Sequence, residues 1–232
     1  MSIHTTPSIP FDLKDEKEVQ KHLANLYIEF NYQCHEDKMP DGCHRLGELL
    51  ELVKRDFTKA ATVYKMNCDE NKYGHSCYKY AQYNLAGLGM EKNLEEGLKY
   101  HSIGCELGFT AACHNGGMLH IGSIVSGKSD PIKGADFLER ACEKKDSDSC
   151  ARLGEAYLTG LKQFQQDKTK AFEYIKKACE LENVRGCGNL SVMYKKGDGV
   201  MQNSEMAEMY KQKTLNLIES TKNPKTKIQF GA

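Results

Sequence analysis

The sequence has no excess of charge of either sign. Its 232 residues include 32 lysines and arginines against 32 aspartates and glutamates, so the formal net charge is zero. Because phosphate backbones and anionic membranes select a basic surface, nucleic acid is not an expected partner. The sequence also lacks any run of about 18 apolar residues, the length that a membrane-spanning helix needs. We therefore predict no transmembrane segment.

The first residues lack the features of a cleaved targeting segment. Residues 1–19 have neither the apolar core of a signal peptide nor the arginine-rich, acid-poor composition of a transit peptide. They carry acidic residues instead, at Asp12, Asp15, Glu16 and Glu18. We expect residues 1–14 to be a flexible N-terminus. Ten cysteines in a sequence without a secretion signal are then the anomaly that needs an explanation.

Several short motifs of metal and cofactor sites are also missing. The sequence has no C-x-x-C, which argues against zinc knuckles, thioredoxin-type redox sites and covalent haem attachment. It has no G-x-G-x-x-G or Walker pattern for phosphate binding. Ser76-Cys-Tyr-Lys79 matches the S-x-x-K motif of penicillin-binding enzymes, but neither K-T-G nor S-D-N accompanies it. We predict no catalytic residue.

The cysteines that are present recur at regular intervals. They form five pairs, separated by 9, 9, 8, 8 and 8 residues, and the first members of the pairs follow one another at intervals of 34, 37, 37 and 37. A period in the thirties is typical of helical repeat arrays, in which each repeat is one supersecondary unit.

The residues around each pair have a helical pattern. A small residue stands eight positions before the first cysteine and a bulky residue five positions before it, as at Ala171 and Tyr174. Residues three apart share one face of a helix. After the second cysteine comes a large residue and then a small one, as at Leu153-Gly154, a pattern interrupted in the third repeat by Gly116-Gly117. Glycines follow the second helix. We therefore predict an all-α fold of helix-turn-helix repeats.

The pattern also predicts the extent of the array. Residues 15–219 are expected to form a single domain of five hairpins, followed by a last helix in which Leu215 occupies the position of a first cysteine. That helix is predicted to be a C-terminal cap. Residues 220–232 are predicted to be a flexible tail.

The hairpin geometry selects one pairing of the cysteines. A cysteine that ends the first helix of a hairpin and a cysteine that starts the second face each other at a distance that a disulfide spans. Each bond is expected to stabilise the fold by about 2 to 3 kcal/mol by restricting the unfolded chain. The alternative is that the cysteines are reduced and pack helix against helix. The predicted bonds are Cys34–Cys43, Cys68–Cys77, Cys105–Cys113, Cys142–Cys150 and Cys179–Cys187.

The repeat resembles the Sel1-like repeat, a variety of tetratricopeptide-like helical hairpin. The shared pattern is A-x-x-Y/F, a small residue with cysteine, seven residues, C-x-x-L-G and a closing Y-x-x-G-x-G, and it is clearest in residues 171–199. The resemblance implies a right-handed superhelical solenoid with a concave inner surface. Two branches of this family carry one disulfide per hairpin. One contains secreted bacterial cysteine-rich proteins, and the other contains animal respiratory-chain assembly factors of the mitochondrial intermembrane space.

The animal branch is the better match. Its features occur in this sequence in the same order, from Asn31-Tyr-Gln-Cys34 through Ala111-Ala-Cys-His-Asn115 to Phe230-Gly231. The resemblance implies import without a cleaved presequence and oxidation by a disulfide relay. It also implies a monomeric, non-enzymatic scaffold that binds respiratory-chain subunits, assembly factors and the import machinery, chiefly for cytochrome c oxidase, complex IV.

Two other functions stay open at this point. One is a haem- or copper-handling factor with thiol-disulfide reductase activity in the same pathway, and the other is a secreted binding protein of the bacterial type. Histidines bear on the first, because His101, His114, Met118 and His120 cluster in the third repeat, and His and Met can ligate haem or copper. We assign His114 and His120 as candidate haem ligands. The alternative is that they are ordinary packing residues, and neither a cofactor nor a metal is required by the sequence.

Overall fold

The protein is an all-α structure of helical hairpins, as predicted. The computed structural model describes residues 14–122, 130–160 and 165–222, and all regular elements in this part are helices. Two compact units follow one another along the chain, Met1–Asn93 and Leu94–Ala232. The predicted flexible N-terminus and most of the predicted flexible tail lie outside the described residues.

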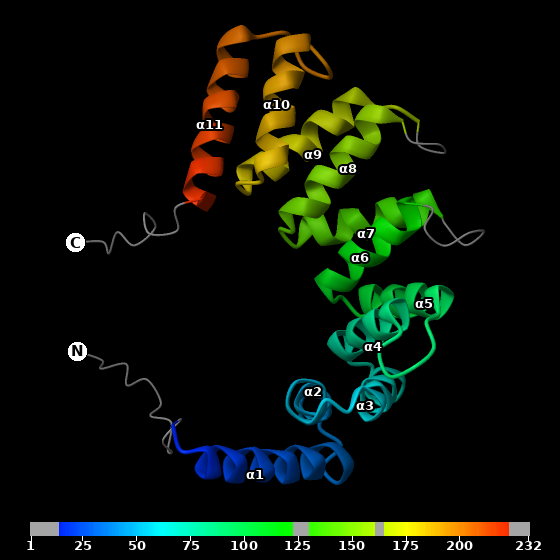
Figure 1. The fold of residues 1–232 in the computed structure, drawn as a ribbon. Helices are drawn as coiled ribbons and strands as arrows, with labels where there is room; N and C mark the ends of the chain where they lie inside the picture. The colour runs from blue at the N-terminus through cyan, green and yellow to red at the C-terminus, as the bar shows by residue number, and fades with distance from the viewer. Residues whose placement is uncertain (1–13, 123–129, 161–164, 223–232) are drawn as a thin grey trace. The chain divides into compact units, whose positions relative to one another are not determined.

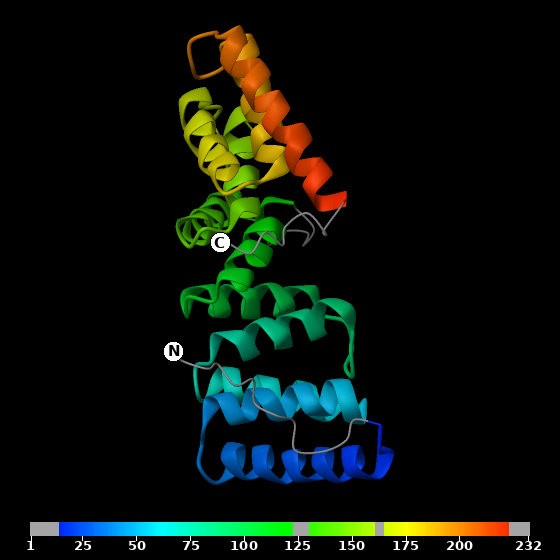
Figure 2. The same ribbon diagram turned by 90° about the vertical axis from the view of Figure 1, so that its left-hand side faces the viewer.

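The first unit consists of two hairpins. Helices that follow one another in the chain lie side by side in both views (Figures 1 and 2). The second helix continues without a break into a turn of π-helix, η1. The elements are α1 (Glu16–His35), α2 (Pro40–Leu49), η1 (Leu50–Lys54), α3 (Phe57–Asp69) and α4 (Gly74–Ala86).

The second unit consists of three hairpins and a single last helix among the described residues, α11, which packs on α10 (Figure 1). This last helix runs to Lys222, so it includes the first residues of the predicted tail. The elements are α5 (Leu94–Glu106), α6 (Thr110–Ile121), α7 (Pro131–Glu143), α8 (Ser147–Thr159), α9 (Lys168–Glu180), α10 (Val184–Lys196) and α11 (Ser204–Lys222).

Aspartates and glycines set the ends of many helices. Asp15 caps α1 by accepting the backbone amides of Lys17 and Glu18, and Asp56, Asp130, Asp146 and Asp167 cap later helices in the same way. Such caps satisfy amides that the first helical turn leaves without partners. At the other end, α4, α8 and α10 stop at glycines with positive φ, namely Gly87, Gly160 and Gly197.

Small residues bring the helices together. In the C-x-x-L-G pattern, a Cβ atom on Gly154 would lie 2.5 Å from Cγ1 of Ile175, and one on Gly47 would lie 2.4 Å from the ring of Tyr64. These distances are too short for real atoms, so only glycine allows the helices to approach so closely. The large partner residues fill the core: Leu153 and Ile175 are buried.

One disulfide joins the two helices of each hairpin. The five bonds are those predicted from the spacing, with Cα–Cα distances of 4.4 to 4.8 Å, and none of the ten cysteines is free. Every cysteine is at most 5% exposed. The bonds therefore lie inside the packed hairpins. Among the described residues, no helix has both the length and the apolar composition needed to cross a membrane.

Candidate functional site

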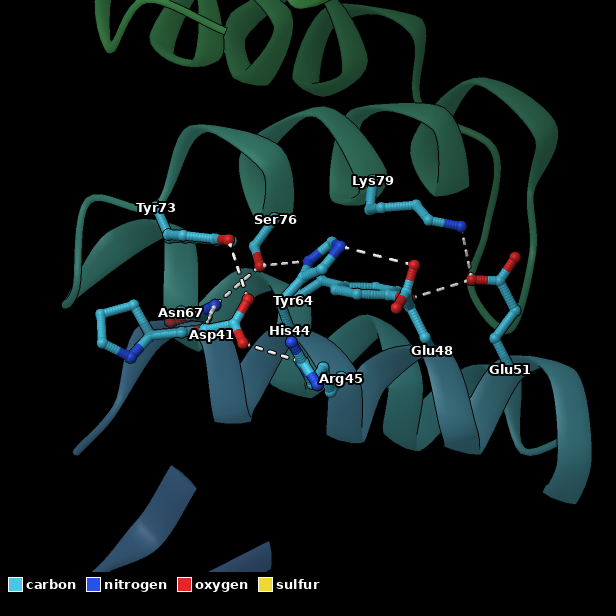
Figure 3. A network of polar contacts seen from close by, with 11 residues as sticks. Asp41, His44, Arg45, Glu48, Glu51, Tyr64, Asn67, Tyr73, Ser76 and Lys79 are labelled. Atoms are coloured by element: carbon cyan, nitrogen blue, oxygen red, sulfur yellow. Dashed lines mark hydrogen bonds and ion pairs between the residues drawn. The ribbon is translucent and has the colours of Figure 1, made fainter. Parts of the chain in front are cut away.

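A buried polar network links the two hairpins of the first unit (Figure 3). At its centre, Nδ1 of His44 on α2 lies 3.0 Å from the hydroxyl of Ser76 on α4. The amide of Asn67 on α3 donates to the same hydroxyl at 2.7 Å and to the carbonyl of Pro40 at 2.8 Å. The hydroxyl of Ser76 can therefore accept from Asn67 and also share a hydrogen bond with Nδ1 of His44. These bonds join polar groups from three helices.

Burial keeps the central histidine neutral. His44 is 3% exposed, and this burial lowers the pKa of its imidazole to about 4, with His75 and Lys79 acting in the same direction. Its Nε2 faces the carboxylate of Glu48 at 3.6 Å. That distance is too long for a hydrogen bond. His44 is therefore a neutral imidazole held by one hydrogen bond.

A half-buried ion pair extends the network (Figure 3). Lys79 donates to Glu51 at 2.9 Å, and the hydroxyl of Tyr64 donates to the same carboxylate oxygen at 3.0 Å. Burial alone would raise the pKa of Glu51, but the hydrogen bonds from Lys79 and Tyr64 outweigh it, so the pKa is lowered. These contacts connect η1 to both helices of the second hairpin.

The network has the residue types of a serine hydrolase but not the access. Ser76, His44 and Glu48 form a chain of hydroxyl, imidazole and carboxylate, yet Ser76 is fully buried and its oxygen is occupied by Asn67. A nucleophile must reach its substrate. Lys79 of the S-x-x-K match is held by Glu51. The arrangement therefore joins two hairpins, and the absence of a catalytic residue stays a prediction.

The same contact occurs in the second unit. Nδ1 of His114 on α6 lies 2.8 Å from the hydroxyl of Ser149 on α8 and 3.2 Å from the carboxylate of Asp146. The hydrogen bond from His114 is the main cause that lowers the pKa of Asp146 to about 2. Asp146 also caps α8 by accepting the amide of Ser149 at 2.7 Å. The histidine thus fastens one hairpin to the start of the next.

The two candidate haem ligands lie in different surroundings. His114 contacts α8, whereas His120 is 5% exposed and its ring packs edge-on against Phe137 of α7 at 5.7 Å. Six residues separate them, which places them on different faces of α6. The structure does not bring the two side chains to one site, and haem binding by this pair stays a prediction. Over residues 14–122, 130–160 and 165–222, no group of three or more His, Cys, Asp or Glu side chains is placed to hold a metal ion.

Comparisons with known proteins agree with this architecture. The Sel1 repeat family pattern matches residues 74–109, 111–146, 147–183 and 184–214. Over 225 residues the chain is 39% identical to cytochrome c oxidase assembly factor 7 of Xenopus tropicalis, and the match covers 95% of this chain and 97% of that one. The chain belongs to the cytochrome c oxidase assembly factor 7 family of Sel1 repeat proteins. The human member is 39% identical over 138 residues, which cover 57% of this chain and 60% of the human one.

A solved structure supports the fold of this family member. The crystal structure of a Sel1 repeat protein from Oxalobacter formigenes superposes with a TM-score of 0.73 at 20% identity and covers 87% of each chain. At this identity the likeness shows the fold alone. The first hairpin precedes the residues that the Sel1 pattern matches, yet it carries the same disulfide. The predicted Sel1-like repeat family is thus confirmed.

The contacts between hairpins were missed in the sequence, although the sequence contains a signal for them. In both pairs the histidine directly follows the second cysteine of one hairpin, and the serine directly precedes the second cysteine of the next. At the following junction the same positions hold Ala151 and Gly186, which cannot form such a bond. A Cys-His dipeptide followed one repeat later by Ser-Cys therefore marks a polar junction.

Proposed function

We propose that the protein is a non-enzymatic assembly factor for cytochrome c oxidase that works in the mitochondrial intermembrane space by binding partner proteins. The observation that carries this proposal is the 39% identity to cytochrome c oxidase assembly factor 7 of Xenopus tropicalis over nearly the whole of both chains. A match that covers all the hairpins favours a common function of the whole array rather than a shared repeat alone.

The disulfides support the compartment. Five buried bonds persist in an oxidising environment, whereas cytosolic thiols are kept reduced. The intermembrane space supplies such an environment next to the membrane that holds the respiratory chain. Binding partners are expected to be respiratory-chain subunits or other assembly factors, in addition to the disulfide-relay import machinery.

Disrupting the gene tests the assembly role. We expect the amount of assembled cytochrome c oxidase on native gels to fall, while ATP synthase in the same gels stays unchanged, and we expect the intact chain to restore it. Normal cytochrome c oxidase in the disrupted cells would contradict the role. Fractionation tests the compartment: the protein should resist protease in intact mitochondria and be digested once the outer membrane is ruptured. Recovery outside mitochondria would favour the secreted, bacterial type of function instead.

The burial of the cysteines favours a scaffold over a thiol-disulfide reductase. Exchange requires a thiolate to reach a disulfide sulfur, and every cysteine here is at most 5% exposed. Titration against glutathione redox buffers separates the two functions. A scaffold keeps all five bonds across mild glutathione ratios, whereas one pair that opens reversibly would support the reductase and handling function.

A further inference from the structure

The second unit contains two equivalent grooves in successive hairpins. The first, about 540 Å³ in volume, lies between α5, the end of α6 and the start of α7. The second, about 550 Å³, lies between α7, the end of α8 and the start of α9. Their lining residues correspond at an offset of 37, which is the repeat length: Leu98 with Ala135, His120 with Tyr157, and Lys133 with Lys170. Equivalent positions in stacked repeats lie on the same side of the stack.

Acidic side chains outnumber lysines in both grooves. Three acidic residues and two lysines line the first, and three acidic residues and one lysine line the second. At equivalent positions, Lys99 and Ser102 of the first groove correspond to Asp136 and Glu139 of the second, whereas Glu95 corresponds to Ile132. The first groove has an apolar wall formed by Leu98 and Ile103. The second is therefore the more acidic, and the first suits an apolar group.

His120 gives the first groove an unused polar group. At the equivalent position, Tyr157 stacks on Tyr174 at 5.8 Å, whereas His120 meets Phe137 edge-on at 5.7 Å. An imidazole also lacks the hydroxyl that extends a tyrosine ring. His120 lines the groove at 5% exposure, and neither ring nitrogen has a hydrogen-bond partner among the described residues. A buried polar atom without a partner costs free energy unless a ligand satisfies it.

We propose that the two grooves bind one extended, basic segment of a partner polypeptide. An apolar side chain of the segment enters the first groove, where His120 bonds its backbone, and a lysine or arginine enters the second groove beside Asp136 and Glu139. Opposite charge attracts the cationic side chain. The ring of Tyr157 takes no part in this, because it stacks on Tyr174 and Lys170 lies over it. This inference rests on the proposed function, since it names the kind of segment that the scaffold recognises.

Fluorescence anisotropy with the full-length, oxidised protein tests the grooves. The probes are fluorescein-labelled peptides that carry one phenylalanine and two lysines separated by Gly-Ser spacers of varied length, and a twin set with glutamate in place of lysine. We expect the lysine peptides to bind at least about tenfold more tightly than the glutamate peptides, with a preference that weakens as salt rises. Equal affinity for both sets would overturn the proposal.

Matched variants assign the binding to the grooves. Asp136→Asn with Glu139→Gln should weaken the lysine peptides about tenfold, whereas Glu173→Gln with Glu205→Gln, which changes the net charge equally on exposed residues outside the grooves, should not. His120→Tyr places the residue of the neighbouring repeats in the first groove. It should keep the fold, followed by circular dichroism, and abolish the preference for phenylalanine over alanine. Affinities that do not respond to the groove variants would overturn the proposal.

Two other occupants have distinct outcomes. If the lysine peptides bind only a full-length Lys225→Glu, Lys227→Glu variant, the C-terminal residues of the chain fill the grooves and the proposal fails. If the protein self-associates in light scattering and the groove variants abolish this, a second copy fills them and the proposal also fails. These experiments use no respiratory-chain component. Loss of peptide binding and loss of the assembly role can therefore be told apart.

Discussion

At the residue scale, the contacts between hairpins depend on histidine–serine hydrogen bonds. His44 bonds with the buried Ser76 in the first unit, and His114 bonds with Ser149 in the second. A buried hydrogen bond between side chains fixes which residues face each other, because a shifted register would leave both partners unsatisfied. We infer that these pairs set the register between consecutive hairpins, while the apolar residues supply most of the stability.

The buried histidines predict a loss of stability in mild acid. Burial lowers the pKa of His44 and of His101 to about 4, below the usual value of about 6.5. The unfolded chain therefore binds protons that the folded chain does not. The contribution of these two histidines to the free energy of unfolding is fully present above about pH 6.5 and is lost as the pH falls from about 6.5 to 4. The slope is at most about 1.4 kcal/mol per pH unit for each histidine.

A His44→Gln variant isolates one of these groups. Glutamine keeps a hydrogen-bonding side chain but does not titrate, so urea unfolding of this variant between pH 4 and pH 7 should show a shallower slope than the unaltered chain. His35→Gln, at an exposed position of the same hairpin, is the control. An unchanged slope in the His44→Gln variant would mean that His44 is protonated in the folded protein.

At the element scale, the glycines of the C-x-x-L-G pattern decide how closely the hairpins pack. In Gly154→Ala, the new Cβ would lie 2.5 Å from Ile175, a fully buried side chain. Relief requires α8 and α9 to move apart, and overpacking of this kind costs about 1 to 3 kcal/mol. We expect the midpoint of urea unfolding of the oxidised protein to fall accordingly.

Gly188→Ala is the matched control, since it makes the same chemical change inside α10. Its new Cβ would have no neighbour closer than Thr214 at 3.8 Å, so the higher helix propensity of alanine should stabilise the protein by about 1 kcal/mol. Opposite signs for the two substitutions are expected. Equal changes in stability would show that close packing at Gly154 is not what selects glycine there.

The regularity of these elements explains what the sequence could predict. Cysteines at both ends of a turn occur in every repeat, so the period fixed the hairpins and the disulfide pairing. The first hairpin departs from this regularity. It has no glycine after its second helix and ends in η1, where Arg55 takes a positive φ of 55°. Arginine rarely adopts a positive φ, and residues 50–55 contain no glycine or asparagine that would indicate a left-handed turn. The sequence therefore gives no signal for this turn.

The contacts between repeats were less accessible to prediction. His44 and Ser76 are 32 residues apart, and each looks like an ordinary polar residue beside a cysteine. The only sequence signal for this contact is a Cys-His dipeptide in one repeat followed by a Ser-Cys dipeptide in the next. The sequence indicated His120 as a candidate ligand but did not show that it is equivalent to Tyr157 and Tyr194 of the next two repeats. In the structure, each of these three rings packs on an aromatic ring of a following helix.

At the scale of the whole molecule, the disulfides connect the fold to the proposed compartment. A chain with 40% hydrophobic residues and 28% charged residues buries a limited core in each hairpin. The disulfide in each hairpin adds to this core, because closing a short loop stabilises the fold by about 2 to 3 kcal/mol. The protein needs an oxidising environment to keep this contribution. Zero net charge, in turn, leaves partner recognition to local features such as the grooves of the second unit.

The central claim is that the protein works with all five hairpin disulfides formed. The most direct measurement is the mass of the protein taken from acid-quenched cells and treated with N-ethylmaleimide, before and after reduction. We predict no added maleimide before reduction and ten after it, one for each cysteine. Ten maleimides on the unreduced protein would contradict both the stapled array and its place in an oxidising compartment.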